Sequence, residues 1–142
     1  MIKKIILLIG LNLFVSTAFG QDKLDSLAIQ NFKEESILPL INKDTEKLSL
    51  LIEFPLKGEW GYMMELQKDE KDWTKEDFFE NYDKLFDDKV IGILKTLDYE
   101  NINLYKSEIL VGINLADDEF AIILRYRYIK GKWKLYVIQG VG

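Results

Sequence analysis

Two arginines are the side chains whose spacing is best suited to ligand chemistry. Arg125 and Arg127 are the only arginines of the chain, and one residue separates them within FAIILRYRYI. Side chains two positions apart in a strand share one face at about 7 Å, so two guanidinium groups there can bind a carboxylate of a ligand or an acidic partner. The commoner use of such residues is pairing across the sheet, here with Glu108 or Glu119, and we favour that interpretation.

Tyrosines and acids offer a second chemistry. A Tyr hydroxyl beside an Asp or Glu base in an apolar pocket can stabilise an oxyanion while the base moves a proton. Four tyrosines are expected on or near inward faces: Tyr62, Tyr82, Tyr126 and Tyr128. Glu65 is the one acid within an apolar strand pattern, but its alternation with apolar neighbours favours the solvent face. We therefore predict no catalytic residue, and we take Tyr62 and Tyr126, with the two arginines, as candidate ligand- or partner-binding residues.

The composition excludes several reaction types. The chain of 142 residues has no His and no Cys. It therefore has no imidazole base, no thiolate nucleophile, no disulfide and no thiolate metal site. Lys and Arg number 19 against 24 Asp and Glu, which gives a formal net charge of −5. An acidic balance argues against nucleic-acid binding, which needs basic patches.

Motifs for metals and nucleotides are not found in the sequence. Two acidic groups, Asp69 and Glu70 with Asp72, and the run 117–119, have the hard oxygen ligands that calcium prefers. Neither has the D-x-[DN]-x-[DN]-G spacing of a calcium loop, so solvated turns are the better interpretation. The chain also lacks the glycine-rich loops that hold phosphates and the G-x-S-x-G context of serine hydrolases. We predict no metal and no cofactor.

Residues 1–20 have the three parts of a secretory signal peptide. Lys3 and Lys4 form a basic start, an apolar run follows, and small residues precede the expected cleavage between Gly20 and Gln21. The apolar run is shorter than the ~20 residues of a membrane-spanning helix, so an uncleaved anchor is the less favoured alternative. Without Lys3 and Lys4 the formal net charge of −5 becomes −7. We expect a bacterial protein that is periplasmic or secreted, and free of the membrane after cleavage.

Residues 21–142 are expected to form a single domain whose first half is mainly helical. Apolar residues at helical spacing predict a helix over 23–35, which Asp22 is available to cap. The apolar pattern continues over 37–41, where Pro39 is expected to break or kink the helix. Further helix starts are indicated by cap residues at Asp44, at Thr74 (as a capping box), and at Asp87 or Asp88. An aromatic stripe in the helix after Thr74 is expected to face the core: Phe78, Phe79, Tyr82, Leu85 and Phe86.

The second half has the alternation of period two that is typical of strands. Strands are predicted over 60–66, 109–115, 120–129 and 133–138, with turns at 116–119 and at Lys130-Gly131. Pro55 is expected to end the helical segment that begins at Asp44. Helices followed by strands indicate an α+β fold with an antiparallel sheet, rather than a parallel α/β fold.

This order of elements, together with LLIEFPL at 50–56 and DFFENYDKLFDDKVIGIL at 77–94, resembles the NTF2-like superfamily (the cystatin/SnoaL-type cone). The similarity is to small exported bacterial domains of that superfamily. It implies a curved antiparallel sheet wrapped around N-terminal helices, with an apolar pocket inside. Members include isomerases, dehydratases and non-catalytic binding domains, so the fold does not assign an activity. The Asp–His pair of many enzymatic members is ruled out here because the chain has no His.

The sequence favours an exported binding or protein-interaction module over an enzyme. We expect it to bind either a small apolar ligand in the cone or a protein partner on the sheet. Two alternatives remain: an isomerase or lyase that uses Tyr and Asp or Glu in an apolar pocket, and an inhibitor or immunity protein for an exported enzyme. NTF2-like domains often form homodimers through the sheet, and the strand face with Ile123, Arg125, Arg127 and Ile129 is suited to that.

Overall fold

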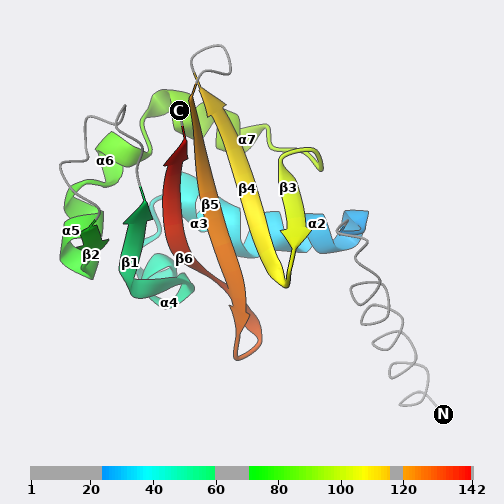
Figure 1. The fold of residues 1–142 in the computed structure, drawn as a ribbon, viewed down its shortest axis with the longest axis horizontal. Helices are drawn as coiled ribbons and strands as arrows, with labels where there is room; N and C mark the ends of the chain where they lie inside the picture. Colours follow the sequence, from blue (N-terminus) through cyan, green and yellow to red (C-terminus); the bar gives the residue numbers. More distant parts are fainter. Residues whose placement is uncertain (1–23, 60–70, 116–119, 142) are drawn as a thin grey trace.

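The computed structural model describes residues 24–59, 71–115 and 120–141, and these form a helical layer against a six-stranded sheet. The strand order is β2-β1-β6-β5-β4-β3. Figure 1 looks onto the sheet, with α2, α3 and α7 behind it. The α+β prediction is confirmed. The predicted signal peptide, the strand over 60–66 with Tyr62 and Glu65, and the turn over 116–119 lie outside the described residues.

The first helices run almost without a break. They are α2 (Ser26–Phe32), the π-helix η1 (Lys33–Ile37), α3 (Leu38–Ile41) and α4 (Thr45–Leu51). Asp25, not Asp22, caps α2, and Asp44 caps α4 as predicted. Pro39 does not end the helical segment, because it lies in the first turn of α3, where a missing N–H is tolerated. The π-helix η1, whose turns are wider than those of an α-helix, comes directly before α3.

Strand β1 (Ile52–Glu59) follows α4 directly, which corrects the prediction that Pro55 ends a helical segment there. It pairs with β2 (Lys71–Trp73) in antiparallel and with β6 in parallel, so the sheet is mixed rather than wholly antiparallel. The β1–β6 register shifts between Ile52 and Lys57. Pro55 falls inside that irregularity, where its missing N–H removes no regular ladder bond.

The next helices begin at the predicted caps. They are α5 (Lys75–Glu80), α6 (Tyr82–Leu85) and α7 (Asp88–Lys95). Thr74 and Asp77 form a complete capping box at the start of α5, and the Asp87 side chain accepts from the Val90 N–H at the start of α7. Asp therefore replaces the usual Glu of the capping box without loss of either hydrogen bond.

Four antiparallel strands complete the sheet, one more than the sequence predicted. They are β3 (Ile102–Tyr105), β4 (Glu108–Leu115), β5 (Phe120–Ile129) and β6 (Lys132–Val141). The two-residue turn between β5 and β6 is Lys130-Gly131, with φ of 50° and 82°. Positive φ at both positions gives a turn whose twist matches that of the strands, and glycine reaches this region without strain.

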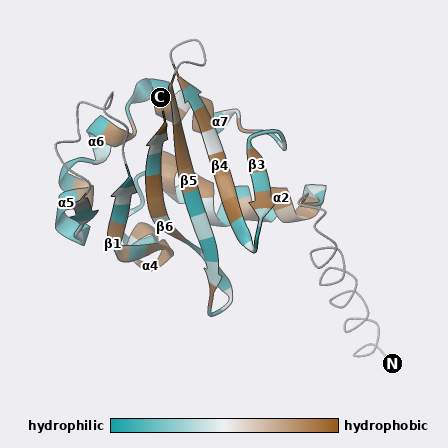
Figure 2. Ribbon diagram, in the orientation of Figure 1, coloured by the Kyte–Doolittle hydropathy of each residue, from teal (hydrophilic) through white to brown (hydrophobic). Residues whose placement is uncertain are grey.

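The core lies between the helices and the inner face of the sheet. Burial alternates along much of β4 and β5, whereas Figure 2 shows β5 as hydrophobic in its first half and mostly hydrophilic in its second. The predicted aromatic stripe is buried, except that Phe79 is partly exposed. The largest fully buried side chains of the described part are Tyr126, Phe78, Ile37, Leu40, Leu48, Leu56, Leu94, Ile109, Ile113, Leu124, Leu135 and Ile138.

A bulge in β6 breaks the predicted alternation of that strand. Leu135 lies opposite Tyr126, and Val137 lies opposite Arg125, so Tyr136 has no partner of its own on β5. Opposed residues of an antiparallel pair share a face, so Val137 belongs to the arginine face and not to the face of Leu135. The sequence prediction had placed Val137 with Leu135, and the extra residue at the bulge is the reason it is wrong.

Within 24–59, 71–115 and 120–141, no helix is long and apolar enough to cross a membrane.

Candidate functional site

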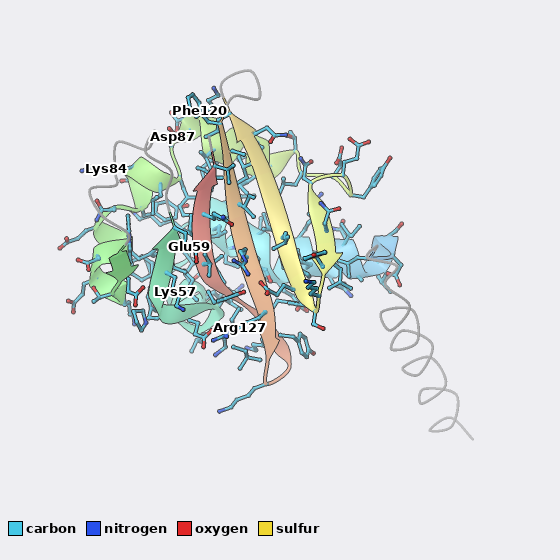
Figure 3. All side chains as sticks on the ribbon, in the orientation of Figure 1. Lys57, Glu59, Lys84, Asp87, Phe120 and Arg127 are labelled. Carbon is cyan, nitrogen blue, oxygen red and sulfur yellow. The ribbon has the colours of Figure 1, made fainter. Side chains whose placement is uncertain are left out.

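The two arginines lie on the face of the sheet that points away from the helices. In Figure 1 none of the described helices lies in front of β4, β5 or β6. Arg125 is opposite Leu110 of β4, and Arg127 is opposite Glu108. We call the outward side of β4, β5 and β6 the open face. Figure 3 shows Arg127 near the lower end of β5, with Lys57 and Glu59 along β1, beyond the intervening β6.

Arg125 is held in a three-residue hydrogen-bond cluster. Its Nε donates to Glu108 Oε1 at 3.2 Å, and its Nη2 donates to Glu108 Oε2 at 3.3 Å. The same Nη2 donates to the Tyr136 hydroxyl at 3.0 Å, and that hydroxyl in turn donates to Glu108. The pairing with Glu108 is the one predicted from the sequence. The second predicted partner, Glu119, lies outside the described residues.

Arg127 pairs with a residue that the sequence did not indicate. Its Nε donates to Glu53 Oε2 at 2.7 Å, and its Nη2 donates to the other oxygen of that carboxylate. Glu53 belongs to β1, so the ion pair spans the intervening strand β6. No local pattern predicts this contact, because it depends on the parallel pairing of β1 with β6, which brings a distant segment beside β5.

Tyr136 joins the two ion pairs into one network. The guanidinium carbon of Arg127 lies 4.6 Å from the centre of the Tyr136 ring, and that of Arg125 lies 5.5 Å from it. Both distances are within the range of cation–π attraction. The β6 bulge places Tyr136 on this face, so the irregularity of the strand builds the network.

The electrostatics of the network favour the charge states that are paired. The hydrogen bond with Glu53 raises the pKa of the Arg127 guanidinium. Burial, and then the hydrogen bond with Glu108, raise the pKa of the Tyr136 hydroxyl, so Tyr136 stays neutral and continues to donate. Two arginines and two glutamates cancel in charge. The guanidinium groups are therefore already occupied by carboxylates of the chain itself.

A shallow groove of about 330 Å³ runs beside this network on the open face. Apolar side chains of Leu110 and Ile123 lie in it next to the paired Glu108 and Arg125. The remaining lining residues are Tyr105, Lys106 and Gln139. An apolar strip bordered by satisfied polar groups and Tyr or Arg side chains is the composition found at protein–protein contacts.

The tyrosines predicted to face inward differ in how deeply they are buried. Tyr82 and Tyr126 are buried at 4% and 2% exposure. Tyr128 lies on the same face of β5 as Tyr126, as predicted, but it is 59% exposed near the end of the strand and meets Trp133 edge to face. Tyr126 alternates with the two arginines and so lies on the opposite face from them. The structure therefore brings Arg125 and Arg127 together but separates Tyr126 from them, and Tyr62 lies outside the described residues.

The described interior contains little ionisable chemistry. Ser36 is the only polar residue that is buried in 24–59, 71–115 and 120–141, so no carboxylate of these ranges lies in the core. Tyr126 is enclosed, and burial raises the pKa of its hydroxyl far above the usual value. In the same ranges no three Asp or Glu side chains gather as metal ligands. The described interior thus offers a Tyr hydroxyl as a donor but no acid beside it.

Several solved structures are similar to this chain at low identity. A crystal structure of an NTF2-like protein from Cytophaga hutchinsonii shares 15% identity, with a TM-score of 0.48, and covers 84% of this chain and 99% of its own. An NTF2-like protein of unknown function from Pseudomonas putida shares 9% identity, with a TM-score of 0.40, and covers 79% and 82%. A de novo designed protein with a curved β-sheet shares 16%, with a TM-score of 0.44, and covers 82% and 94%.

Neither a family model nor a curated protein matches the chain. NTF2-like proteins are thus among the solved structures that the chain resembles, as its sequence motifs indicate. The likeness concerns the path of the chain and assigns no ligand and no activity.

Proposed function

We propose that this chain is an exported, non-catalytic binding module that associates through the open face of its sheet, with a second copy of itself as the partner. The observation that supports this most directly is the neutral network of Arg125, Arg127, Glu108 and Glu53 beside an apolar groove. Because each guanidinium already has its carboxylate, the two arginines are not free to bind an anionic substrate. The face is instead an ordered platform, by which we mean that hydrogen bonds already hold the side chains of Arg125, Arg127 and Tyr136 in place.

An ordered platform lowers the cost of association, because the long side chains at its centre lose little freedom when a partner covers them. A two-fold contact between identical faces also needs a surface that is complementary to itself. A central network in which two positive and two negative groups cancel helps to meet this condition, whereas a centre of one charge would repel its copy. Leu110 and Ile123 supply the apolar centre that such a contact requires.

Ile123 is the residue through which the association can be tested. The Ile123→Lys variant places a charge in the apolar groove, and the Ile129→Lys variant places the same charge on the same face of β5, outside the groove. We expect sedimentation of the unchanged chain to show a dimer at about 100 µM, Ile123→Lys to be monomeric, and Ile129→Lys to remain dimeric. A monomeric unchanged chain at that concentration, or dimers of both variants, would overturn the proposal.

Export is the second part of the proposal, and the pattern of residues 1–20 supports it. The test is to express the whole chain in a bacterium and to determine the first residue of the protein recovered outside the cytoplasm. We expect Gln21. A chain that retains residues 1–20 in the cytoplasm would contradict export and would leave the dimerisation test unaffected.

A further inference from the structure

A second groove lies on the helical side of the molecule, away from the open face. Its volume is about 460 Å³, within the range of small-molecule sites. It is bounded by η1, the first turn of α3, the end of α4 and the β5–β6 turn. The side chains that matter for its chemistry are Ser36, Trp133, Glu34, Glu35, Lys47 and Lys132.

Ser36 is the most informative of these residues. It is 3% exposed, it lines the groove, and its hydroxyl has no hydrogen-bond partner among the residues that the structure describes. A buried hydroxyl without a partner costs about 1–3 kcal/mol, and native proteins keep few such groups. The hydroxyl of Ser36 is therefore available to a ligand in the groove, both as a donor and as an acceptor.

The backbone beside Ser36 departs from the regular helical hydrogen-bond pattern. The Leu38 N–H donates to the Lys33 carbonyl across the π-turn, and Pro39 has no N–H. Neither of the donors that an α- or π-turn would offer to the Glu34 carbonyl therefore reaches it. Glu34 lines the groove, and π-turns of this kind recur at functional sites.

Trp133 gives the groove an apolar wall. Its ring is partly buried against the core and meets Tyr128 nearly edge to face, at 5.1 Å between centres and 68° between planes. Tyr128 does not line the groove, whereas Trp133 does. A ligand with a flat apolar face can stack on the indole, as aromatic surfaces favour.

The charges of the groove determine the class of ligand. Glu34 and Glu35 supply two negative groups, and Lys47 and Lys132 supply two positive ones. A ligand with a net charge would meet as much repulsion as attraction. Hydroxyl groups, in contrast, donate to carboxylates and accept from ammonium groups, so a neutral polyol satisfies all four side chains and Ser36 as well.

We propose that this groove binds a neutral carbohydrate, with one sugar ring stacked on Trp133 and a sugar hydroxyl hydrogen-bonded to Ser36. The proposal does not depend on dimerisation, because none of the groove residues belongs to the groove on the open face. A carbohydrate presents one face of C–H groups and a rim of hydroxyls, which is the pattern that the indole wall and the polar rim complement.

The test uses two neutral trisaccharides, maltotriose and triacetylchitotriose, titrated into the purified chain and followed by calorimetry and by NMR of the indole N–H signals. We expect at least one of them to bind with a Kd of about 1 mM or tighter, with the Trp133 signal shifted. The zwitterion diglycine is the competing probe, because a ligand with one charge of each sign also suits two acids and two lysines.

Ser36→Ala removes the hydroxyl with almost no change of shape. We expect the affinity for the sugar to fall about five- to tenfold, while the free energy of unfolding stays equal or rises because an unsatisfied polar group is removed. The matched control is Ser49→Ala, since the Ser49 hydroxyl donates to the Thr45 carbonyl at 2.6 Å and does not line the groove. Trp133→Leu, which keeps an apolar side chain, is expected to weaken binding more than tenfold.

Three results would overturn the proposal: neither trisaccharide binds, diglycine binds in their place, or Ser36→Ala and Ser49→Ala bind the sugar as tightly as the unchanged chain does. Urea unfolding of each variant separates loss of binding from loss of folding.

Discussion

The guanidinium group of Arg127 donates two hydrogen bonds to the carboxylate of Glu53, a residue 74 positions earlier in the chain. Strand β6 lies between the strands that supply them, so the ion pair crosses the sheet above a third strand. It therefore joins β1, which enters from the helical half, to the antiparallel strands of the second half. The position of β1 in the sheet is therefore held twice: by backbone pairing with β6, and by the side-chain ion pair with β5.

The strength of this ion pair can be measured by a double-mutant cycle. Arg127→Ala, Glu53→Ala and the double variant are compared by urea unfolding. The side chains are 47% and 34% exposed, so we expect a coupling energy below about 1 kcal/mol, which falls further in high salt. The less exposed pair of Arg125 and Glu108, at 29% and 26%, is the comparison and is expected to couple more strongly. A larger coupling for Arg127 and Glu53 would contradict this order.

Local features were predictable from the sequence because a few neighbouring residues determine them. The caps at Asp44, Thr74 and Asp87 each satisfy N–H groups within three residues, and the Lys130-Gly131 turn needs only two positions that reach positive φ. The burial of alternate residues in β4 follows in the same way from the period of a strand.

The features that were missed depend on contacts between distant segments. Strand β1 contains Pro55 and follows a helix directly, and its pairing with the distant strands β2 and β6 makes it a strand. The bulge at Tyr136 adds one residue to β6, and no residue type marks it in advance. Glu53 is one acid among 24, and its role depends on both of these irregularities. The pair of Arg125 and Glu108 was thus predictable, but the pair of Arg127 and Glu53 and the position of Tyr136 between the two arginines were not.

The capping box before α5 is expected to stabilise the fold measurably. The Thr74 hydroxyl accepts from the Asp77 N–H at 3.1 Å, and the Asp77 carboxylate accepts from the Thr74 N–H at 3.4 Å. Thr74→Ala is expected to lower the free energy of unfolding by about 1 kcal/mol. Thr45→Ala is the control, because Thr45 follows the cap of α4 and is exposed. Equal losses for the two variants in urea unfolding would mean that the box contributes nothing specific.

The buried hydroxyl of Tyr82 donates to the carbonyl of Leu40 and so joins α6 to α3. Tyr82→Phe removes this donor, while the Leu40 carbonyl still accepts from the Lys43 N–H at 3.3 Å. We therefore expect a loss of about 1 kcal/mol near neutral pH, since one net hydrogen bond disappears and no buried acceptor is left without a partner. Tyr99→Phe is the control, because Tyr99 is 66% exposed.

The same variant is expected to show a dependence on pH. Burial, and then the charge of Asp83, raise the pKa of Tyr82 from 10.0 to about 12. As the pH rises, the Tyr82 hydroxyl therefore loses its proton in the unfolded chain before it does so in the folded chain. The contribution of the protonated Tyr82 hydroxyl to the free energy of unfolding is complete below pH 10 and is lost between pH 10 and 12. The unfolding free energy of the unchanged chain, relative to that of Tyr82→Phe, should fall by up to about 1.4 kcal/mol per pH unit in that window, so that the variant becomes the more stable chain before pH 12. A relative stability of the unchanged chain that stays constant or increases with pH would contradict this assignment.

Tyr126 is expected to respond in the opposite way to the same substitution. Its ring is fully enclosed and meets Phe32 edge to face at 4.9 Å, but its hydroxyl has no hydrogen-bond partner in the described part of the chain. Tyr126→Phe keeps the ring contact and removes a polar group that has lost its water. We expect the free energy of unfolding to stay equal or to rise by up to about 1 kcal/mol, whereas Tyr82→Phe lowers it. Urea unfolding of both variants at neutral pH makes the comparison. A loss at Tyr126 as large as the loss at Tyr82 would show that the hydroxyl has a partner in solution, and would make Tyr126 the donor of a polar site inside the fold.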